Sequence, residues 1–178
     1  MEVLNHIRLM ADYNQQLNKQ VCQAAGMLNH ESLVEHRGAF FGSVLGTLNH
    51  LMVGDLIWLK RFAGHPAQHV ALNPIRATEA PVALEQQLFS TMEGLWQERQ
   101  ILDAVIVSWS RELKAEDLDH CLEYSSMKGV SSHRQMGALI MHFFNHQTHH
   151  RGQLSTLLYQ QGFDIGLTDL LYFIPEES

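Results

Sequence analysis

Apolar residues recur at steps of three and four along four long segments of this chain, and this period constrains the fold more than any other feature. In the first segment the repeat runs from Ile7 through Leu17 to Leu28. The other three segments are Ala39–Phe62, Pro81–Leu113 and Ser132–Gln161. A period near 3.6 residues is that of an amphipathic helix with one buried face. The sequence therefore predicts four long helices.

Signals for helix ends and turns separate these segments. Gly64 and Pro66 end the second helix, residues 63–81 have no sustained period, and Gly162 ends the fourth. Ser132 and Gln135 have the spacing of a capping box, so we expect them to open the fourth helix. Residues 30–37 are expected to form a loop.

The period changes between Lys114 and Ser131. Leu118, His120, Leu122 and Tyr124 alternate with polar residues, and Lys128-Gly129 offers a turn. This predicts a short hairpin or irregular excursion before the last helix. The tail after Gly162 is expected to dock on the helices through its bulky residues Leu170, Leu171, Tyr172, Phe173 and Ile174.

These elements predict an all-α fold, an antiparallel four-helix bundle, with residues 1–178 as one domain. A net charge of -7 without any basic segment argues against nucleic acid as a partner. No apolar run approaches the ~20 residues of a membrane span, and the N-terminal segment lacks a signal-peptide pattern. We therefore expect a cytoplasmic protein, in which Cys22 and Cys121 stay reduced.

The stretch HFFNHQTHHRGQLSTLL, residues 142–158, holds four of the twelve histidines. On a helical wheel His146 and His150 lie inside the apolar stripe, His142 lies at its edge, and His149 lies just beyond His142. Each buried ring nitrogen without a partner costs about 1–3 kcal/mol. A metal ion bound by both rings, one turn apart, would remove that cost. The alternative is a pair of core histidines that find ordinary hydrogen bonds.

Three polar residues on other helices remain open between a functional and a structural role. His50 has small residues one turn away on each side, Gly46 and Gly54, so it either reaches another helix or permits close packing. Asp55 lies in a bulky stripe, where it either orients a ligand imidazole or pairs with an arginine. Asn14 either makes a structural hydrogen bond or faces a functional cavity.

Several common catalytic motifs are missing from the sequence. Gln147 stands where the H-E-x-x-H motif of zinc proteases has its glutamate. The chain has no paired E-x-x-H motifs, which disfavours a di-iron centre. Serine-hydrolase elbows and phosphate-binding glycine loops are also missing.

Three separate segments resemble motifs of the DinB/YfiT-like family of metal-dependent four-helix-bundle proteins. HFFNHQTHHRGQLSTLL resembles its H-x-x-N-H-x-x-(Y/H)-H-R helix, GTLNHLMVGDLIWLKRFAG its H-x-x-x-x-D-x-x-W-L helix, and ADYNQQLNKQV its Y-N-x-W-x-N pattern. A closing T-D-L-L-x-F extends the resemblance over nearly the whole chain.

The resemblance implies that His50, His146 and His150 bind one divalent metal ion, typically nickel or zinc. His142 and Asn145 correspond to supporting residues, and His149 to a variable position. Iron and copper also accept imidazole ligands, so the ligand set does not fix the metal. The resemblance also implies a homodimer, and it leaves the substrate open.

Three hypotheses for the function follow. The first is an enzyme of the hydrolase or thiol S-transferase type, in which the metal activates water or a thiolate for reaction with a small molecule. A low-molecular-weight thiol is one candidate substrate, and His142 and Asn14 are candidates for proton transfer or orientation. The second is a non-catalytic dimeric module that senses or holds a metal or ligand. The third is a helical dimer whose histidines only satisfy one another.

Overall fold

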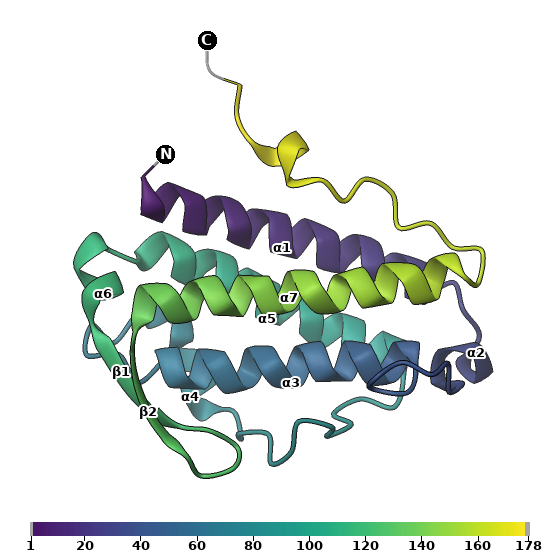
Figure 1. Ribbon diagram of the computed structural model, residues 1–178, viewed down its shortest axis with the longest axis horizontal. Helices are drawn as coiled ribbons and strands as arrows, with labels where there is room; N and C mark the ends of the chain where they lie inside the picture. Colours follow the sequence, from purple (N-terminus) through teal and green to yellow (C-terminus); the bar gives the residue numbers. More distant parts are fainter. Residues whose placement is uncertain (1, 177–178) are drawn as a thin grey trace.

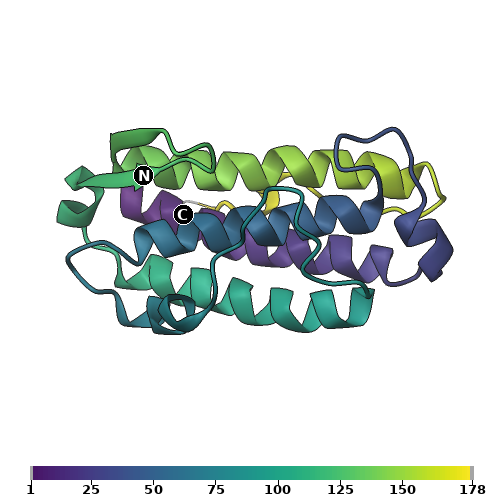
Figure 2. The ribbon, with the colours of Figure 1, turned by 90° about the horizontal axis from the view of Figure 1, so that it is seen from below.

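The computed structural model describes residues 2–176 and is mostly helical, with one small two-stranded sheet. Four long helices lie side by side (Figures 1 and 2): α1 (Val3–Ala25), α3 (Val44–Phe62), α5 (Met92–Glu112) and α7 (Met136–Tyr159). The short elements are α2 (His30–Val34), η1 (Val70–Leu72), α4 (Asn73–Ala77), α6 (Ala115–Asp119), β1 (Cys121–Ser125), β2 (Ser131–Gln135) and η2 (Leu170–Phe173).

The four long helices do not simply alternate in direction. In Figure 1, α1 and α7 run one way along the molecule, and α3 and α5 run the other way. Hydrogen bonds agree, because Asn49 near the start of α3 bonds to Phe89 just before α5. The neighbouring pairs α1/α5 and α3/α7 are therefore antiparallel, whereas α3/α5 are parallel. Two parallel helices in succession need a connection that runs back along the molecule.

Residues 63–91 make that return, and they correct the predicted third helix. We expected it to begin at Pro81, but α5 begins at Met92, where the Thr91 hydroxyl caps the helix by accepting from the Gly94 amide at 3.3 Å. The apolar residues between Pro81 and Thr91 belong to the returning chain. Their spacing resembles that of a helix because one side of the returning chain packs on the core, as one side of an amphipathic helix does.

The predicted hairpin before the last helix is present, but the predicted capping box is wrong. Ser132 and Gln135 belong to β2, where they pair with Tyr124 and Cys121 of β1. Helix α7 begins at Met136, directly after Gln135, and has no side-chain cap. A strand uses the same backbone donors that a capping box would satisfy, so the two are alternatives for one sequence.

Two further boundaries differ from the prediction. Helix α3 begins at Val44, not Ala39, because the Ser43 side chain accepts from the Gly46 amide at 3.0 Å. The expected loop after α1 contains the short helix α2.

Large side chains from three of the long helices form the centre of the core. Phe62 stacks on Trp109 with ring centroids 4.9 Å apart and meets the edge of Phe143 at 6.0 Å.

Both cysteines are free thiols, and burial raises the pKa of Cys22 to about 12. Within residues 2–176, no helix is long and apolar enough to cross a membrane.

The C-terminal tail docks along α1, though not through all the residues that we expected. Ile165 is buried, the Tyr13 hydroxyl donates to the Thr168 carbonyl at 2.6 Å, and Phe173 packs edge-on against Tyr13 at 5.2 Å. Leu171, Tyr172 and Ile174 are exposed instead of docked. The tail is therefore held mainly by its earlier residues.

Candidate metal centre

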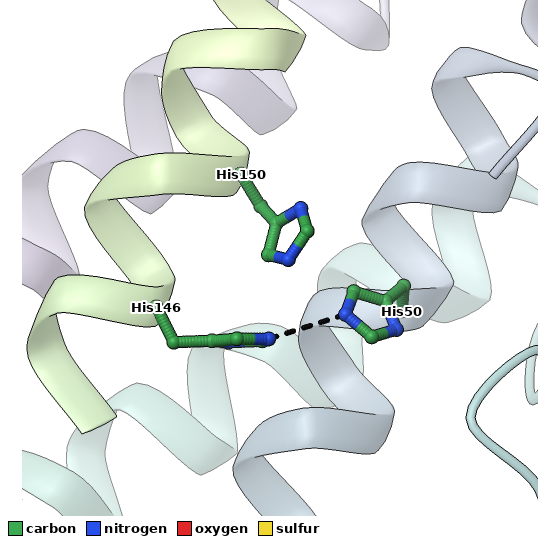
Figure 3. A group of neighbouring side chains, drawn as sticks. All are labelled: His50, His146 and His150. Atoms are coloured by element: carbon green, nitrogen blue, oxygen red, sulfur yellow. Dashed lines mark hydrogen bonds between the residues drawn. The ribbon is translucent and has the colours of Figure 1, made fainter. Parts of the chain in front are cut away.

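Three imidazole rings from two helices turn toward a common space between α3 and α7 (Figure 3). His50 comes from α3, and His146 and His150 come from successive turns of α7. The Nε2 atoms of His50 and His146 lie 3.2 Å apart, and the three rings each offer a nitrogen within 4.8 Å of the others. Two nitrogens at ~2.05 Å from one tetrahedral ion are about 3.3 Å apart, so this spacing fits a shared ion.

The outer nitrogens of two of these rings face oxygen acceptors. His50 Nδ1 lies 3.1 Å from the Leu84 carbonyl, and His150 Nδ1 lies 2.8 Å from Gln153 Oε1. An oxygen of this kind can only accept, so each Nδ1 carries the proton and each Nε2 keeps a lone pair. Metal-binding histidines are oriented by the same type of outer hydrogen bond. His50 and His150 are therefore in the form that binds a metal through Nε2.

The rings are neutral at physiological pH, as metal ligands must be. Burial, together with the neighbouring rings of His150 and His50, lowers the pKa of His146 to about 3. Burial also lowers the pKa of His50 and of His150. No proton has to be removed from an imidazolium before a cation binds.

An aromatic side chain covers one side of the cluster. The Phe41 ring stacks on His50 with centroids 3.6 Å apart and meets the edge of His150 at 5.5 Å. Gly46 makes this approach possible, since a Cβ there would lie 2.1 Å from the Phe41 carbonyl oxygen. Phe41 therefore shields the rings from water on that side.

Gly54 provides the space for the His146 ring, and its replacement gives a first prediction. A Cβ at position 54 would lie 2.9 Å from His146 Cε1, closer than such atoms approach. We expect Gly54→Ala to displace the ring and weaken metal binding by about tenfold or more while α3 stays folded. Metal titration by calorimetry measures the effect. Gly152→Ala in α7 is the control, because a Cβ there meets nothing within 4 Å. Equal affinities for the two variants would contradict the proposed ring position.

A second group of possible ligands, His65, His69 and Asp117, differs in its protonation pattern. His65 Nδ1 accepts from the Ala67 amide at 3.1 Å, so the neutral ring carries its proton on Nε2. His69 Nε2 donates to Asp117 Oδ2 at 3.0 Å, which leaves the lone pair on Nδ1. The other two ring nitrogens, His65 Nε2 and His69 Nδ1, are buried without a hydrogen-bond partner among the described residues. The bond from His69 to Asp117 ties the loop to α6.

Asp55 and Asn14 lie in a buried polar network behind the histidines. Asp55 Oδ2 accepts from Arg99 at 2.6 Å and its Oδ1 accepts from Gln147. Of the two roles considered for Asp55, the structure has the pair with an arginine. Asn14 Oδ1 accepts from Arg151, which is a structural hydrogen bond. The network joins all four long helices and consists of Asn14, Asn18, Asp55, Arg99, Asp103, Gln147 and Arg151. Gln147, one residue after His146, ties α7 to α3, and Arg151, one residue after His150, ties α7 to α1.

A cavity of about 630 Å³ opens from the cluster and follows the seam between α3 and α7 to the hairpin. His50, Gly54 and His146 line its inner end. His142 lies farther along, with its ring 5.0 Å from that of Trp58, and burial lowers its pKa. Of the two supporting residues, His142 lines this cavity and Asn145 does not. His149, at the variable position, is exposed and does not line the cavity either.

Sequence reasoning missed several residues that shape the site. Phe41 and Leu84 lie in connections that the sequence analysis assigned to the second and third helices, and no signal in the sequence places them beside His50. Gln153 is three residues after His150, a spacing at which helical side chains meet, and could have been found.

The fold and this site define a helical protein with a three-histidine group open to a cavity, and comparisons with known proteins give the family. The sequence profile of the DinB family matches residues 1–177. Protein DinB of Bacillus subtilis (strain 168) is 24% identical over 158 residues, covering 89% of this chain and 87% of that protein. The chain belongs to the DinB family.

A solved structure has a similar fold. The crystal structure of a DinB-like protein from Bacillus cereus ATCC 10987 superposes with a TM-score of 0.57 at 18% identity. The match covers 85% of this chain and 89% of that one.

Proposed function

We propose that this protein binds a divalent metal ion through His50, His146 and His150 and acts as a metal-dependent enzyme on a small molecule. The observation that carries the proposal is the convergence of the Nε2 lone pairs of His50 and His150 beside His146 Nε2. Three protein ligands leave one coordination position open, as in catalytic rather than structural zinc sites. Nickel or zinc is the expected ion, although iron and copper also accept three imidazoles.

The reaction class that fits is hydrolysis or thiol S-transfer. When bound, the ion would supply a Lewis acid that lowers the pKa of water or a thiol, giving a nucleophile at neutral pH. The chain contributes the rest: Leu84 and Gln153 hold two rings in place, Phe41 covers them, and the cavity admits a substrate. His142, in the same cavity, is our candidate for proton transfer.

The alternative is a non-catalytic module that holds or senses a metal or small ligand. In both cases we propose a cytoplasmic homodimer with the four-helix-bundle organisation of its family. Metal analysis of protein purified without added metal tests the shared claim. Turnover of the metal-loaded protein with a panel of thiols and electrophiles then separates the two, because only the enzyme gives a rate that requires metal.

Removal of the metal is expected to lower the melting temperature. An ion that binds only the native state stabilises it by RT ln(1 + [L]/Kd), which is about 2.7 kcal/mol at a hundredfold excess over Kd. Differential scanning calorimetry before and after chelation measures the shift, and metal analysis confirms removal. An unchanged melting curve after confirmed removal would count against a site built from these rings.

A further inference from the structure

The cavity that begins at the histidines ends among cations. Its lining includes Arg61, Lys128 and Arg134, three of the twelve lysines and arginines, and within the described residues it includes no aspartate or glutamate. The chain as a whole has a net charge of -7. The hairpin accounts for this contrast, because Arg134 lies opposite Leu122 on the inner face, whereas Glu123 points to the other face.

Arg61 is held in place without a carboxylate partner. Its guanidinium lies 4.4 Å from the ring centroid of Trp58 and 4.6 Å from that of Tyr124. One Nη2–H donates to the Ser125 carbonyl at 2.9 Å. The ion pairs of the described residues involve Arg37, Arg99, Arg111, Lys114 and His69, and none of the three cavity cations. A fixed guanidinium with free N–H groups is suited to bind an anionic oxygen.

The distance between the two ends of the cavity sets the length of a ligand that reaches both. His50, Gly54, Trp58 and Arg61 follow at steps of four, four and three, so they lie on one face of α3. The eleven steps from His50 to Arg61 rise about 16 Å along the helix. Ile57, Trp58 and Leu139 line the cavity between the two ends and give it an apolar wall.

We infer that the hairpin end of the cavity is a subsite for the anionic group of the substrate, a carboxylate or a phosphate, bound by Arg61 with Arg134 and Lys128 nearby. This inference rests on the proposed function, since it places the reacting group of the same molecule at the histidines. The substrate class is then an extended small molecule with a metal-binding group at one end, an apolar middle, and an anion roughly 10–15 Å away.

The test uses three probes with the same eight-carbon chain: ω-mercaptooctanoate, ω-mercaptooctyl phosphate and ω-mercaptooctanol. Isothermal titration calorimetry with metal-loaded and metal-free protein measures each affinity. We expect at least one anionic probe to bind about tenfold or more tighter than the alcohol, as charge-assisted hydrogen bonds give. The anionic probe that binds more tightly shows whether the subsite prefers a carboxylate or a phosphate.

Variants then locate the preference. Arg61→Met should reduce the preference for the anionic probe over the alcohol to about threefold or less and leave the metal content unchanged. Arg61→Lys should retain part of this preference. Arg134→Gln should weaken it without disturbing the contacts of Arg61. Arg111→Met, an exposed cation outside the cavity, is the control and should change nothing.

Two results would overturn the inference: equal affinity of all three probes for the natural protein, or a preference that survives both Arg61→Met and Arg134→Gln. These results differ from a failure of the proposed function. If the protein took up no metal, the metal-free titrations would still decide whether the anion subsite exists.

Discussion

Replacement of His146 with alanine is expected to abolish metal binding at physiological concentrations. His146 Nε2 lies 3.2 Å from His50 Nε2, and its ring centroid lies 5.1 Å from that of His50 and 4.5 Å from that of His150. Loss of an outer hydrogen-bond partner of a ligand costs 10–100-fold in affinity, and loss of a ligand itself should exceed about 100-fold. Metal analysis and competition with a chromophoric chelator measure the change.

His149→Ala is the matched control, because His149 lies on the same helix with its ring on the exposed side. We expect it to keep the metal. If His146→Ala retained the metal content of the natural protein, the three rings would only be hydrogen-bonded core residues. The hypothesis of a helical dimer without a metal would then account for the cluster.

Replacement of Arg99 with methionine is expected to cost about 3–5 kcal/mol of folding free energy, the penalty for leaving a buried charge without its partner. Arg99 lies between two buried carboxylates, at 2.6 Å from Asp55 Oδ2 and 2.8 Å from Asp103 Oδ1. Since small domains are stable by only about 5–15 kcal/mol, this single change takes a large share. Urea unfolding followed by circular dichroism measures the loss.

The matched control is Arg111→Met, which removes an exposed arginine paired with Asp12 at 3.3 Å. An exposed pair of this kind contributes about 0–1 kcal/mol. If the two variants lost similar amounts of unfolding free energy, the buried ion pairs of Arg99 would be worth no more than an exposed pair.

The deficit of Arg99→Met should shrink as the pH is lowered from 7 toward 5. Burial raises the pKa of Asp55 to about 6 even beside Arg99, and without the arginine it rises further. A carboxyl whose pKa is raised by folding binds more protons in the folded state, so acid favours that state and the gain is lost as the pH rises through the folded pKa. Unfolding curves at a series of pH values test this, and a deficit that grows in acid would contradict it.

The sequence predicted positions best where a polar residue interrupted a repeating apolar pattern. His146 and His150 interrupt an apolar stripe, and this was enough to place them on the buried side of α7. His50 remained ambiguous from its own helix, because small neighbours permit either packing or reach, and the family resemblance was needed to pair it with α7. Leu84 and Phe41 could not be found, since they depend on where connections cross in space.

The errors about the fold have similar causes. The stretch after Pro81 has helical spacing, but the parallel order of α3 and α5 requires extended chain there. Ser132 and Gln135 have a capping pattern, but pairing with β1 satisfies their backbone instead. In both cases a local preference gave way to a constraint set by distant residues.

The three rings come from distant parts of the chain, since His146 lies 96 positions after His50. During synthesis α3 leaves the ribosome long before α7 exists, and until α7 docks His50 is a lone imidazole with little hold on any cation. If the three rings bind the proposed ion, its acquisition follows completion of the fold. A chain that stops before residue 150 would then lack one of the three ligands, and metal uptake would report that α7 has docked.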